Sequence, residues 1–187
     1  ADRAILEFAS THATPRIVVL RPGTIYGPGV KLPLGRFPMP IPLGARPIVA
    51  GDGRVPMPLT YVDNVIDAMR LGAVRDLPNG RVFNIIDEPE LDQAKVAAIL
   101  GELAGPRKRP RFMPYFMAWS MMLLIDLVSL ARGRGMGTAR YRLQRTLADM
   151  RYRSLAARQE LGWEPKIATA EGLRRVVAAE KVTPYPY

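Results

Sequence analysis

The sequence predicts an α/β fold, and three features of the chain lead to that prediction. Residues 16–20 form a short, mostly β-branched apolar run that is typical of a buried parallel strand. Residues 82–86 form a second such run, directly after a turn signal at Asn79 and Gly80. Helical spacing of apolar residues precedes and follows it, over residues 61–74 and 92–104. A strand, a long irregular region and then alternating helices and strands indicate the α/β class.

The composition excludes several classes of protein. Of the 187 residues, 48% are hydrophobic, which excludes a disordered chain. The absence of cysteine excludes a disulfide framework and a thiolate zinc site, and His12 is the only histidine, so no metal site is expected. No secretory signal opens the chain, and the lack of cysteine fits a reducing compartment. The expected localisation is therefore cytoplasmic, with the inner face of a membrane as an alternative.

The charge of the chain is strongly positive. A net charge of +10 favours acidic partners such as nucleic acid, anionic lipid or phosphorylated substrates. The basic residues are spread along the chain, with one cluster of Arg107, Lys108, Arg109 and Arg111. A solvated basic surface explains this distribution as well as a binding role does. Because there is no basic helix with interleaved aromatic residues, nucleic acid is not expected as a partner.

The helical patterns also predict which side chains face the core. Residues 2–10 have the pattern of a further helix, whereas residues 23–58 are rich in turn formers and contain no long element. Within residues 61–74, the predicted inward face consists of Val62, Val65, Ile66, Met69 and Ala73. Within residues 92–104 it consists of Val96, Ile99, Leu100 and Leu103, and in the last helix of Leu173, Val176 and Val177.

The most informative string covers residues 17–29 and reads IVVLRPGTIYGPG. A buried strand there runs into a sharp turn of glycine and proline. Ligands of open α/β sheets bind just outside the carboxyl ends of the strands, and glycine lets the backbone approach a ligand closely. Taken alone, the string is explained more simply by an ordinary exit from a strand into a loop.

Two further strings follow in a characteristic order. Residues 51–53 read GDG and are followed by YVDNV at residues 61–65, while LGWEP at residues 161–165 precedes EGL at residues 171–173. Together with the first string, they resemble the carboxy-terminal half of the NAD(P)-dependent epimerase/dehydratase family, which belongs to the extended short-chain dehydrogenases/reductases. The resemblance covers roughly residues 1–180.

The resemblance implies the carboxy-terminal part of a Rossmann-type NAD(P)-binding fold plus a small α/β substrate lobe. Residues 1–29 would be the end of the Rossmann-type domain, with the tail of the active-site helix, a strand and the nicotinamide-side loop. Residues 30–187 would be mainly the substrate lobe, with late helices and strands returning to the Rossmann-type sheet. The implied cofactor-binding residues are Pro22, Gly23 and Ile25, and the implied substrate-binding residues are Thr24, Tyr26, Lys31 and Arg54.

Two parts of the family's chemistry are missing from this sequence. There is no glycine-rich fingerprint to hold a pyrophosphate, and no tyrosine is followed four residues later by a lysine. We therefore expect no catalytic residue in this chain, and neither activity nor dinucleotide binding by the chain alone. The complete protein would use NAD or NADP, with a missing amino-terminal half as partner, and would exchange a hydride at a secondary alcohol. A homodimer is a further open possibility, and the alternative function is a non-catalytic binding or membrane-surface module.

One departure from the family pattern bears on the substrate. Many members that act on nucleotide sugars have an arginine before the Tyr-Val-Asp string that holds the diphosphate, and Met57 stands there in this chain. A methionine cannot make a bidentate phosphate contact, although Arg54 or Lys31 offers a positive charge nearby in the sequence. Both a nucleotide sugar and a less polar, hydroxysteroid-like substrate therefore stay open.

Residues 112–131 form the most apolar stretch, and Asp126 is their only charge. Twenty residues are long enough to span a bilayer, but Pro114, Ser120, Asp126 and Ser129 argue against a span. A core helix, an interfacial helix and a true span are the three alternatives. If the segment is a helix, the stripe expected to meet the core consists of Met117, Met121, Leu124 and Leu127.

Overall fold

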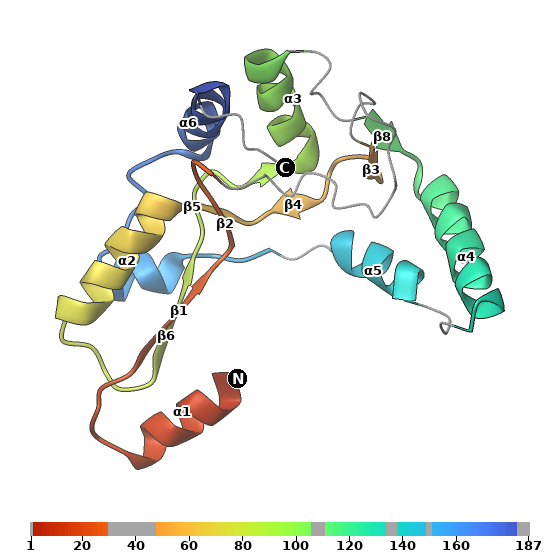
Figure 1. Ribbon diagram of the computed structural model, residues 1–187. Helices are drawn as coiled ribbons and strands as arrows, with labels where there is room; N and C mark the ends of the chain where they lie inside the picture. Colours follow the sequence, from red (N-terminus) through yellow and green to blue (C-terminus); the bar gives the residue numbers. More distant parts are fainter. Residues whose placement is uncertain (1, 30–47, 106–110, 134–137, 149–150, 183–187) are drawn as a thin grey trace. The chain divides into compact units, whose positions relative to one another are not determined.

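The computed structural model describes residues 2–29, 48–105, 111–133, 138–148 and 151–182. The chain forms two compact units, each assembled from separate stretches of sequence (Figure 1). Unit 1 contains the described residues of 1–30, 58–90 and 151–176, and unit 2 those of 31–57, 91–150 and 177–187. Both units combine helices with short strands, so the predicted α/β class is confirmed.

Unit 1 is built on two parallel strand pairs. β1 (Val18–Pro22) pairs with β6 (Arg81–Ile85), so that Pro22 lies opposite Ile85. The shorter strands β2 (Thr24–Tyr26) and β5 (Leu59–Tyr61) form the second pair. The helical elements of the unit are α1 (Asp2–Thr11), α2 (Val62–Val74), the π-helical turn η1 (Ala157–Leu161) and the start of α6 (Thr169–Val182). The two predicted strands and the helices of residues 2–10 and 61–74 are confirmed, with boundaries shifted by one or two residues.

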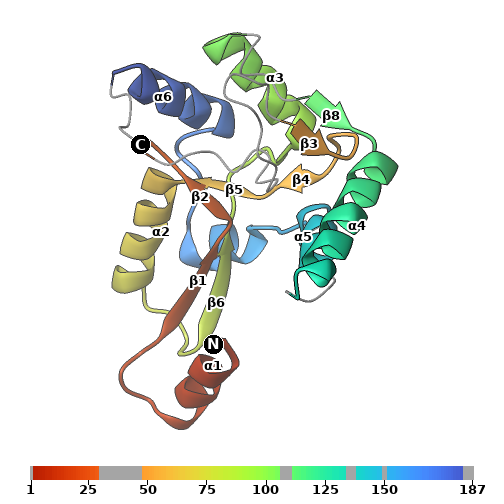
Figure 2. The ribbon, with the colours of Figure 1, turned by 45° about the vertical axis from the view of Figure 1, so that its right-hand side comes forward.

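The core of unit 1 lies where α2, β6 and η1 meet (Figure 2). Phe83 and Ile85 point to the same face of β6 because side chains alternate along a strand, and both are fully buried. They pack with the buried residues Ala68, Leu77, Ala157, Leu161 and Trp163. Gly162 ends η1 in the left-handed conformation, with φ of 68°, which glycine adopts without strain.

The turn before β6 fastens α1 to the rest of unit 1. The side-chain oxygen of Asn79 accepts a hydrogen bond from the amide of Ile17 at 2.8 Å. Its side-chain nitrogen donates to the carbonyl oxygens of Ala9 and His12, at 2.8 and 2.7 Å. The next residue, Gly80, has a φ of 77° and donates its amide to the carbonyl of Ile17. The predicted turn is therefore confirmed, and it also holds the end of α1 beside the start of β1.

The predicted inward face of α2 is partly wrong. Ile66 and Met69 are 56% and 60% exposed, whereas Asn64, Val65 and Ala68 are buried. The side chain of Asn64 hydrogen-bonds to Asp87 and to the backbone of residues 166–167. A buried amide that loses such partners costs about 1–3 kcal/mol for each unsatisfied group. The helix is therefore oriented by its one buried polar residue as well as by its apolar stripe.

Within the described residues, unit 2 contains two short strand pairs and three helices. β3 (Ile48–Ala50) pairs in parallel with β8 (Arg111–Met113), and β4 (Pro56–Met57) pairs antiparallel with β7 (Leu91–Asp92). The helices are α3 (Gln93–Ala104), α4 (Tyr115–Ala131) and α5 (Thr138–Thr146). The side chain of Asp92 caps α3 by accepting a hydrogen bond from the amide of Lys95 at 2.7 Å. Helices α4 and α5 pack against each other as an antiparallel pair (Figure 2).

The predicted helix within residues 112–131 is confirmed, but the stripe expected to meet the core is only partly right: of its four residues, Met121 packs half-buried against the core cluster. Met117, Leu124 and Leu127 are 49%, 61% and 48% exposed. The buried residues of α4 are Ala118, Met122 and Asp126. The carboxylate of Asp126 accepts a hydrogen bond from Nε of Arg140 on α5 at 2.9 Å. Because α4 is apolar on nearly every side, hydrophobic periodicity carries little information about its orientation. Its inner side carries Ala118, Met122 and the ion pair of Asp126 with Arg140.

Candidate functional site

A pocket of about 380 Å³ lies at the carboxyl ends of β1 and β6, within unit 1. Pro22 is the last residue of β1 and Ile86 directly follows β6, and both residues line this pocket. The lining consists of Arg21, Pro22, Gly23, Thr24, Pro58, Asn84, Ile86 and Tyr152. The parallel pairing predicted for the strand before the Leu20–Gly29 loop is confirmed, and this end of parallel strands is where open α/β sheets bind ligands.

Gly23 occupies a position that no other residue fits. A Cβ built on it would collide with the carbonyl oxygen of Pro58 and would come within 2.8 Å of Cδ1 of Ile86. Its amide donates to the carbonyl of Ile85 at 3.1 Å and to the hydroxyl of Thr60 at 3.1 Å. The missing side chain thus lets two strand ends approach each other and leaves bare backbone at the wall of the pocket.

Thr60 is a positioning residue beneath this wall. Its side chain is buried, and its hydroxyl donates to the carbonyl of Ile85 at 2.6 Å while it accepts from the amide of Gly23. The next amide along the chain, that of Thr24, donates to the carbonyl of Pro58 at 2.7 Å. These bonds fix the backbone of residues 23–24 against the strand that ends at Tyr61, so the pocket wall is rigid at this point.

The opposite part of the pocket lining comes from two residues, Asn84 and Tyr152, that were not predicted as site residues from the sequence. Asn84 lies in β6 and Tyr152 lies in the segment before η1, with 42% of Tyr152 exposed. The segment is held in place by Ser154, whose hydroxyl accepts from the amide of Ile86 at 2.9 Å and donates to its carbonyl at 3.1 Å. Asn84 had a usable signal, because it is a polar residue inside an apolar strand. Tyr152 had none, since only the fold brings it to the pocket.

The predicted site residues fall into three groups. Pro22, Gly23 and Thr24 lie together in the lining of the pocket. Ile25 is 42% exposed and is not part of that lining. Arg54 lies in unit 2, is exposed and pairs with Asp52 at 3.5 Å. Lys31 lies outside the described residues.

Tyr26 is a packing residue in this structure. It is fully buried, and its hydroxyl donates to the carbonyl of Thr169 at 3.1 Å. Its ring meets that of Tyr61 edge-on, with ring centroids 5.4 Å apart, and a Cβ on Gly172 would collide with its hydroxyl. Burial raises the pKa of Tyr26. The phenol therefore anchors the start of α6 and stays protonated at neutral pH.

A buried polar network stands behind the pocket wall, next in sequence to Ile86. The carboxylate of Asp87 accepts hydrogen bonds from the amide of Tyr61 at 2.7 Å and from the side chain of Asn64 at 2.8 Å. Burial raises the pKa of Asp87 from 3.8 to about 6, although these hydrogen bonds favour the charged form. Asn64 also accepts from the amides of Lys166 and Ile167, so one side chain joins three segments of unit 1.

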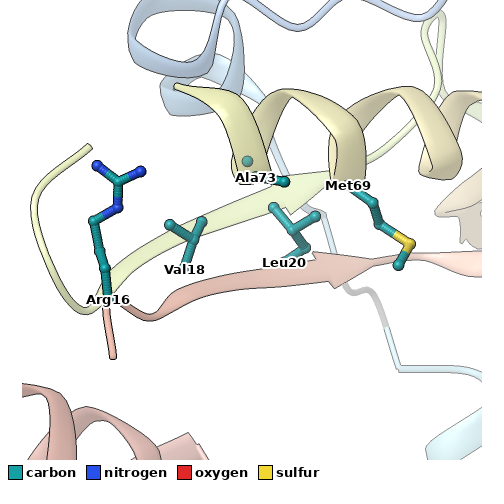
Figure 3. Close-up of a pocket in the computed structure, with 6 residues that line it drawn as sticks. Arg16, Val18, Leu20, Met69 and Ala73 are labelled. Atoms are coloured by element: carbon teal, nitrogen blue, oxygen red, sulfur yellow. The ribbon is translucent and has the colours of Figure 1, made fainter. Parts of the chain in front are cut away.

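A second pocket, of about 440 Å³, lies between β1 and α2 (Figure 3). Val18 and Leu20 of β1 and Met69 and Ala73 of α2 give it an apolar lining, together with Gly72 and Arg16. The guanidinium of Arg16 is engaged by Asp76 at 2.5 Å and by the carbonyl of Arg75 at 2.9 Å. Within the described residues, β1 is paired along one edge only, by β6.

The known proteins that match this chain are longer than it is, and the match covers only part of each of them. No family model matches it. The uncharacterized protein YbjS of Escherichia coli K12 is 23% identical over 181 residues, which is 95% of this chain and 54% of YbjS. The chain spans about half the length of the curated relatives it matches.

Solved structures match nearly the whole chain. MoeE5 in complex with UDP-glucuronic acid and NAD matches 97% of this chain and 52% of its own, with a TM-score of 0.66 and 20% identity. UDP-glucose 4-epimerase of Thermotoga maritima matches 98% of this chain and 52% of its own, with a TM-score of 0.65 and 21% identity. At these identities the likeness concerns the fold: the chain has the Rossmann-type fold of epimerases and dehydratases over about half of the length of those proteins.

Proposed function

We infer that this chain forms the nicotinamide-side loop and the substrate lobe of an NAD(P)-dependent epimerase, dehydratase or dehydrogenase that acts on a secondary alcohol. The observation that carries the inference is Gly23, which brings bare backbone to the wall of a pocket at the carboxyl ends of two parallel strands. The close approach of residues 23, 58 and 86 that Gly23 permits builds the pocket wall beside which a flat ring would lie. NAD in the complex of MoeE5 supports this choice of cofactor.

The lining residues divide into two roles under this proposal. Pro22 and Gly23 lie beside the nicotinamide through their backbone, and Ile25 belongs to the same loop. Thr24 and Asn84 offer a hydroxyl and an amide to the substrate, while Tyr152 closes the pocket from the other side. NAD or NADP, when bound by the complete protein, supplies hydride transfer at the alcohol carbon. Proton transfer would belong to a residue outside this chain.

A further part of the protein would complete the sheet. Within the described residues β1 is paired along one edge only, by β6. The solved structures that match this chain are about twice as long. Both facts support an amino-terminal half as the partner. Residues 1–29 would then belong to its cofactor domain and residues 30–187 mainly to the substrate lobe.

The substrate class rests on two opposing observations. The UDP-sugar ligands of MoeE5 and of the Thermotoga maritima epimerase favour a nucleotide sugar. Pro22, Pro58 and Ile86 make much of the pocket wall apolar, and Met57 occupies the place of the diphosphate-binding arginine, which favours a less polar alcohol. Arg54, which would supply a charge for a diphosphate, is exposed and paired with Asp52.

The test compares the intact protein with residues 1–187 alone. Calorimetry should show NAD(H) or NADP(H) binding by the intact protein and none by the isolated chain, because the pyrophosphate-binding turn is absent from it. A panel of UDP-sugars and hydroxysteroids, followed by the absorbance of the reduced nicotinamide, identifies the substrate class. Micromolar dinucleotide binding to the isolated chain would contradict the inference.

One substitution tests the pocket itself. Thr24→Leu fills space beside Gly23, so kcat/KM for the alcohol should fall by roughly tenfold or more while the protein stays folded. Leu155→Gln is the control, since Leu155 is 56% exposed and outside the pocket lining. Unchanged kcat/KM in Thr24→Leu, or an intact protein that binds no dinucleotide, would favour the alternative of a non-catalytic binding or membrane-surface module.

A further inference from the structure

Helix α4 presents a wide apolar surface. Its outward side chains are between 40% and 68% exposed: Phe116, Met117, Leu124, Leu127, Val128 and Leu130. The opposite side of the helix is buried through Ala118, Met122 and Asp126. Asp126 is the only charged residue of α4, and its side chain is 3% exposed, so the outward side carries no charge. A continuous apolar surface of this kind marks a place where something else binds.

The charge around α4 is positive. Arg111 before the helix and Arg132 after it are both exposed. The sequence from Gly105 to Ala148 has only one acidic residue, Asp126, which is paired with Arg140. Its basic residues are Arg107, Lys108, Arg109, Arg111, Arg132, Arg134, Arg140, Arg142 and Arg145. The outward side of α4 is apolar and basic residues lie beyond both of its ends. This arrangement complements a lipid layer, which has apolar acyl chains beneath anionic headgroups.

This positive charge argues against a second copy of the chain as the partner that covers the apolar side of α4. Two copies of α4 facing each other would bring two sets of unbalanced arginines together, and like charges across an interface are destabilising.

The helix is also too short to cross a bilayer. Its 17 residues correspond to about 26 Å, less than the hydrocarbon core of about 30 Å. Among the described helices, none has the length and apolar character of a membrane span.

A pocket of about 310 Å³ flanks the apolar surface. Tyr115 and Trp119 of α4 line it together with Arg140, Tyr141 and Gln144 of α5. The guanidinium of Arg145 also lies over the ring of Tyr141, 5.9 Å from its centre. Tyrosine and tryptophan favour the boundary between lipid and water, and arginine binds phosphate oxygens. The pocket therefore has the composition that a phospholipid headgroup requires.

We propose that α4 lies in the plane of an anionic membrane surface. Its outward side chains enter the acyl-chain region, and the pocket between α4 and α5 holds a headgroup phosphate. A helix that lies in the interface plane, with its apolar side chains in the acyl boundary and basic residues near its ends, binds a membrane without crossing it. The proposal stands on unit 2 and does not depend on the cofactor pocket of unit 1, so each can fail while the other holds.

The test is co-sedimentation of the intact protein with vesicles. Vesicles of phosphatidylglycerol and phosphatidylcholine in equal parts should bind the protein, and vesicles of phosphatidylcholine alone should bind it far more weakly. Salt should weaken binding because it screens the arginines. Arg111→Ser and Arg132→Ser should each lower the partition coefficient by roughly fivefold. Leu124→Gln combined with Leu127→Gln should lower it by about tenfold or more, since both side chains leave the acyl region.

Two controls make the result decisive. Leu155→Gln changes an exposed leucine of unit 1 and should leave sedimentation unchanged. Circular dichroism should show that the α4 variants stay folded, because the changed side chains are exposed. Absence of sedimentation at low salt would overturn the proposal. So would a wild-type dimer in analytical ultracentrifugation that the α4 variants convert to a monomer, because the surface would then be a subunit interface.

Discussion

The strand ends of unit 1 and the α4–α5 pair of unit 2 distribute polar and apolar side chains in opposite ways. Around β6, polar side chains point inward and are satisfied: Thr60, Asn64, Asp87 and Ser154 are all buried. On α4, apolar side chains point outward, and one ion pair, Asp126 with Arg140, holds the inner side. The first arrangement fixes backbone at a pocket, whereas the second presents a surface. Loss of a buried hydrogen-bond partner should therefore destabilise unit 1, and loss of the Arg140 side chain beside Asp126 should destabilise the α4–α5 pair.

The largest expected effect is that of Asn64→Ala. The substitution removes the partners of the Lys166 and Ile167 amides, of the Ile167 carbonyl and of one Asp87 oxygen. At about 1–3 kcal/mol for a buried unsatisfied group, the free energy of unfolding should fall by about 4 kcal/mol. Chemical denaturation measures the loss. Asp63→Ala, an exposed neighbour on α2, is the control and should cost about 1 kcal/mol or less. A small loss for Asn64→Ala would show that unit 1 does not depend on this network.

The corresponding experiment on unit 2 is Arg140→Met. It removes the Arg140 guanidinium from beside the carboxylate of Asp126, whose side chain is 3% exposed, and this should cost about 3 kcal/mol. The double variant Asp126→Leu, Arg140→Met should recover most of the loss, since the buried charge is then gone. Arg145→Met changes an exposed arginine of the same helix and should have little effect. If the double variant is as unstable as Arg140→Met, the ion pair is not what orients α4.

The same contrast explains which features could be predicted from the sequence. The strands at residues 16–20 and 82–86 were predictable because a run of β-branched residues bounded by turn formers specifies local structure. The turn at Asn79 and Gly80 and the left-handed Gly162 were predictable for the same reason, since each depends on its own backbone. The motif around Gly23 indicated the strand end at which the pocket lies because the glycine's role is local: it makes room for two adjacent segments.

The features that could not be predicted from the sequence depend on contacts between residues far apart in the chain. Tyr152 reaches the pocket only because Ser154 binds the backbone of Ile86, 68 residues away in sequence. The orientation of α2 depends on Asn64 and Asp87, 23 residues apart, and that of α4 on Asp126 and Arg140. In both helices a buried polar residue with partners in other elements faces inward, and hydrophobic periodicity does not detect such a residue.

A smaller effect is expected from the titration of Asp87. Its pKa in the fold is about 6, above the ordinary value of 3.8, because burial disfavours the carboxylate. The contribution of Asp87 to the free energy of unfolding is therefore fully present below about pH 4 and is lost as the pH rises through about 6. The difference between wild type and Asp87→Asn should change by an amount on the order of 3 kcal/mol between these limits. Denaturation at several pH values measures it, with Asp63→Asn as the exposed control. A difference that does not vary with pH would mean that the carboxylate is better solvated than its burial indicates.

The smallest effect on stability should come from substitutions on the outward side of α4. Two nearby residues of this helix, one exposed and one buried, allow a direct comparison. Leu124 is 61% exposed and Met122, two residues earlier, is 1% exposed. Met122→Ala should cost about 2–3 kcal/mol because it leaves a cavity against Ala50 and Leu143. Leu124→Ala should change the free energy of unfolding by no more than about 0.5 kcal/mol, since its side chain is largely in water before and after folding. Both variants are measured by thermal and chemical denaturation at several protein concentrations. A large loss for Leu124→Ala that grows with protein concentration would place this side chain in an interface between copies of the chain. A negligible loss would leave the outward side of α4 free for a partner that is absent from a solution of the pure protein, as the membrane proposal requires.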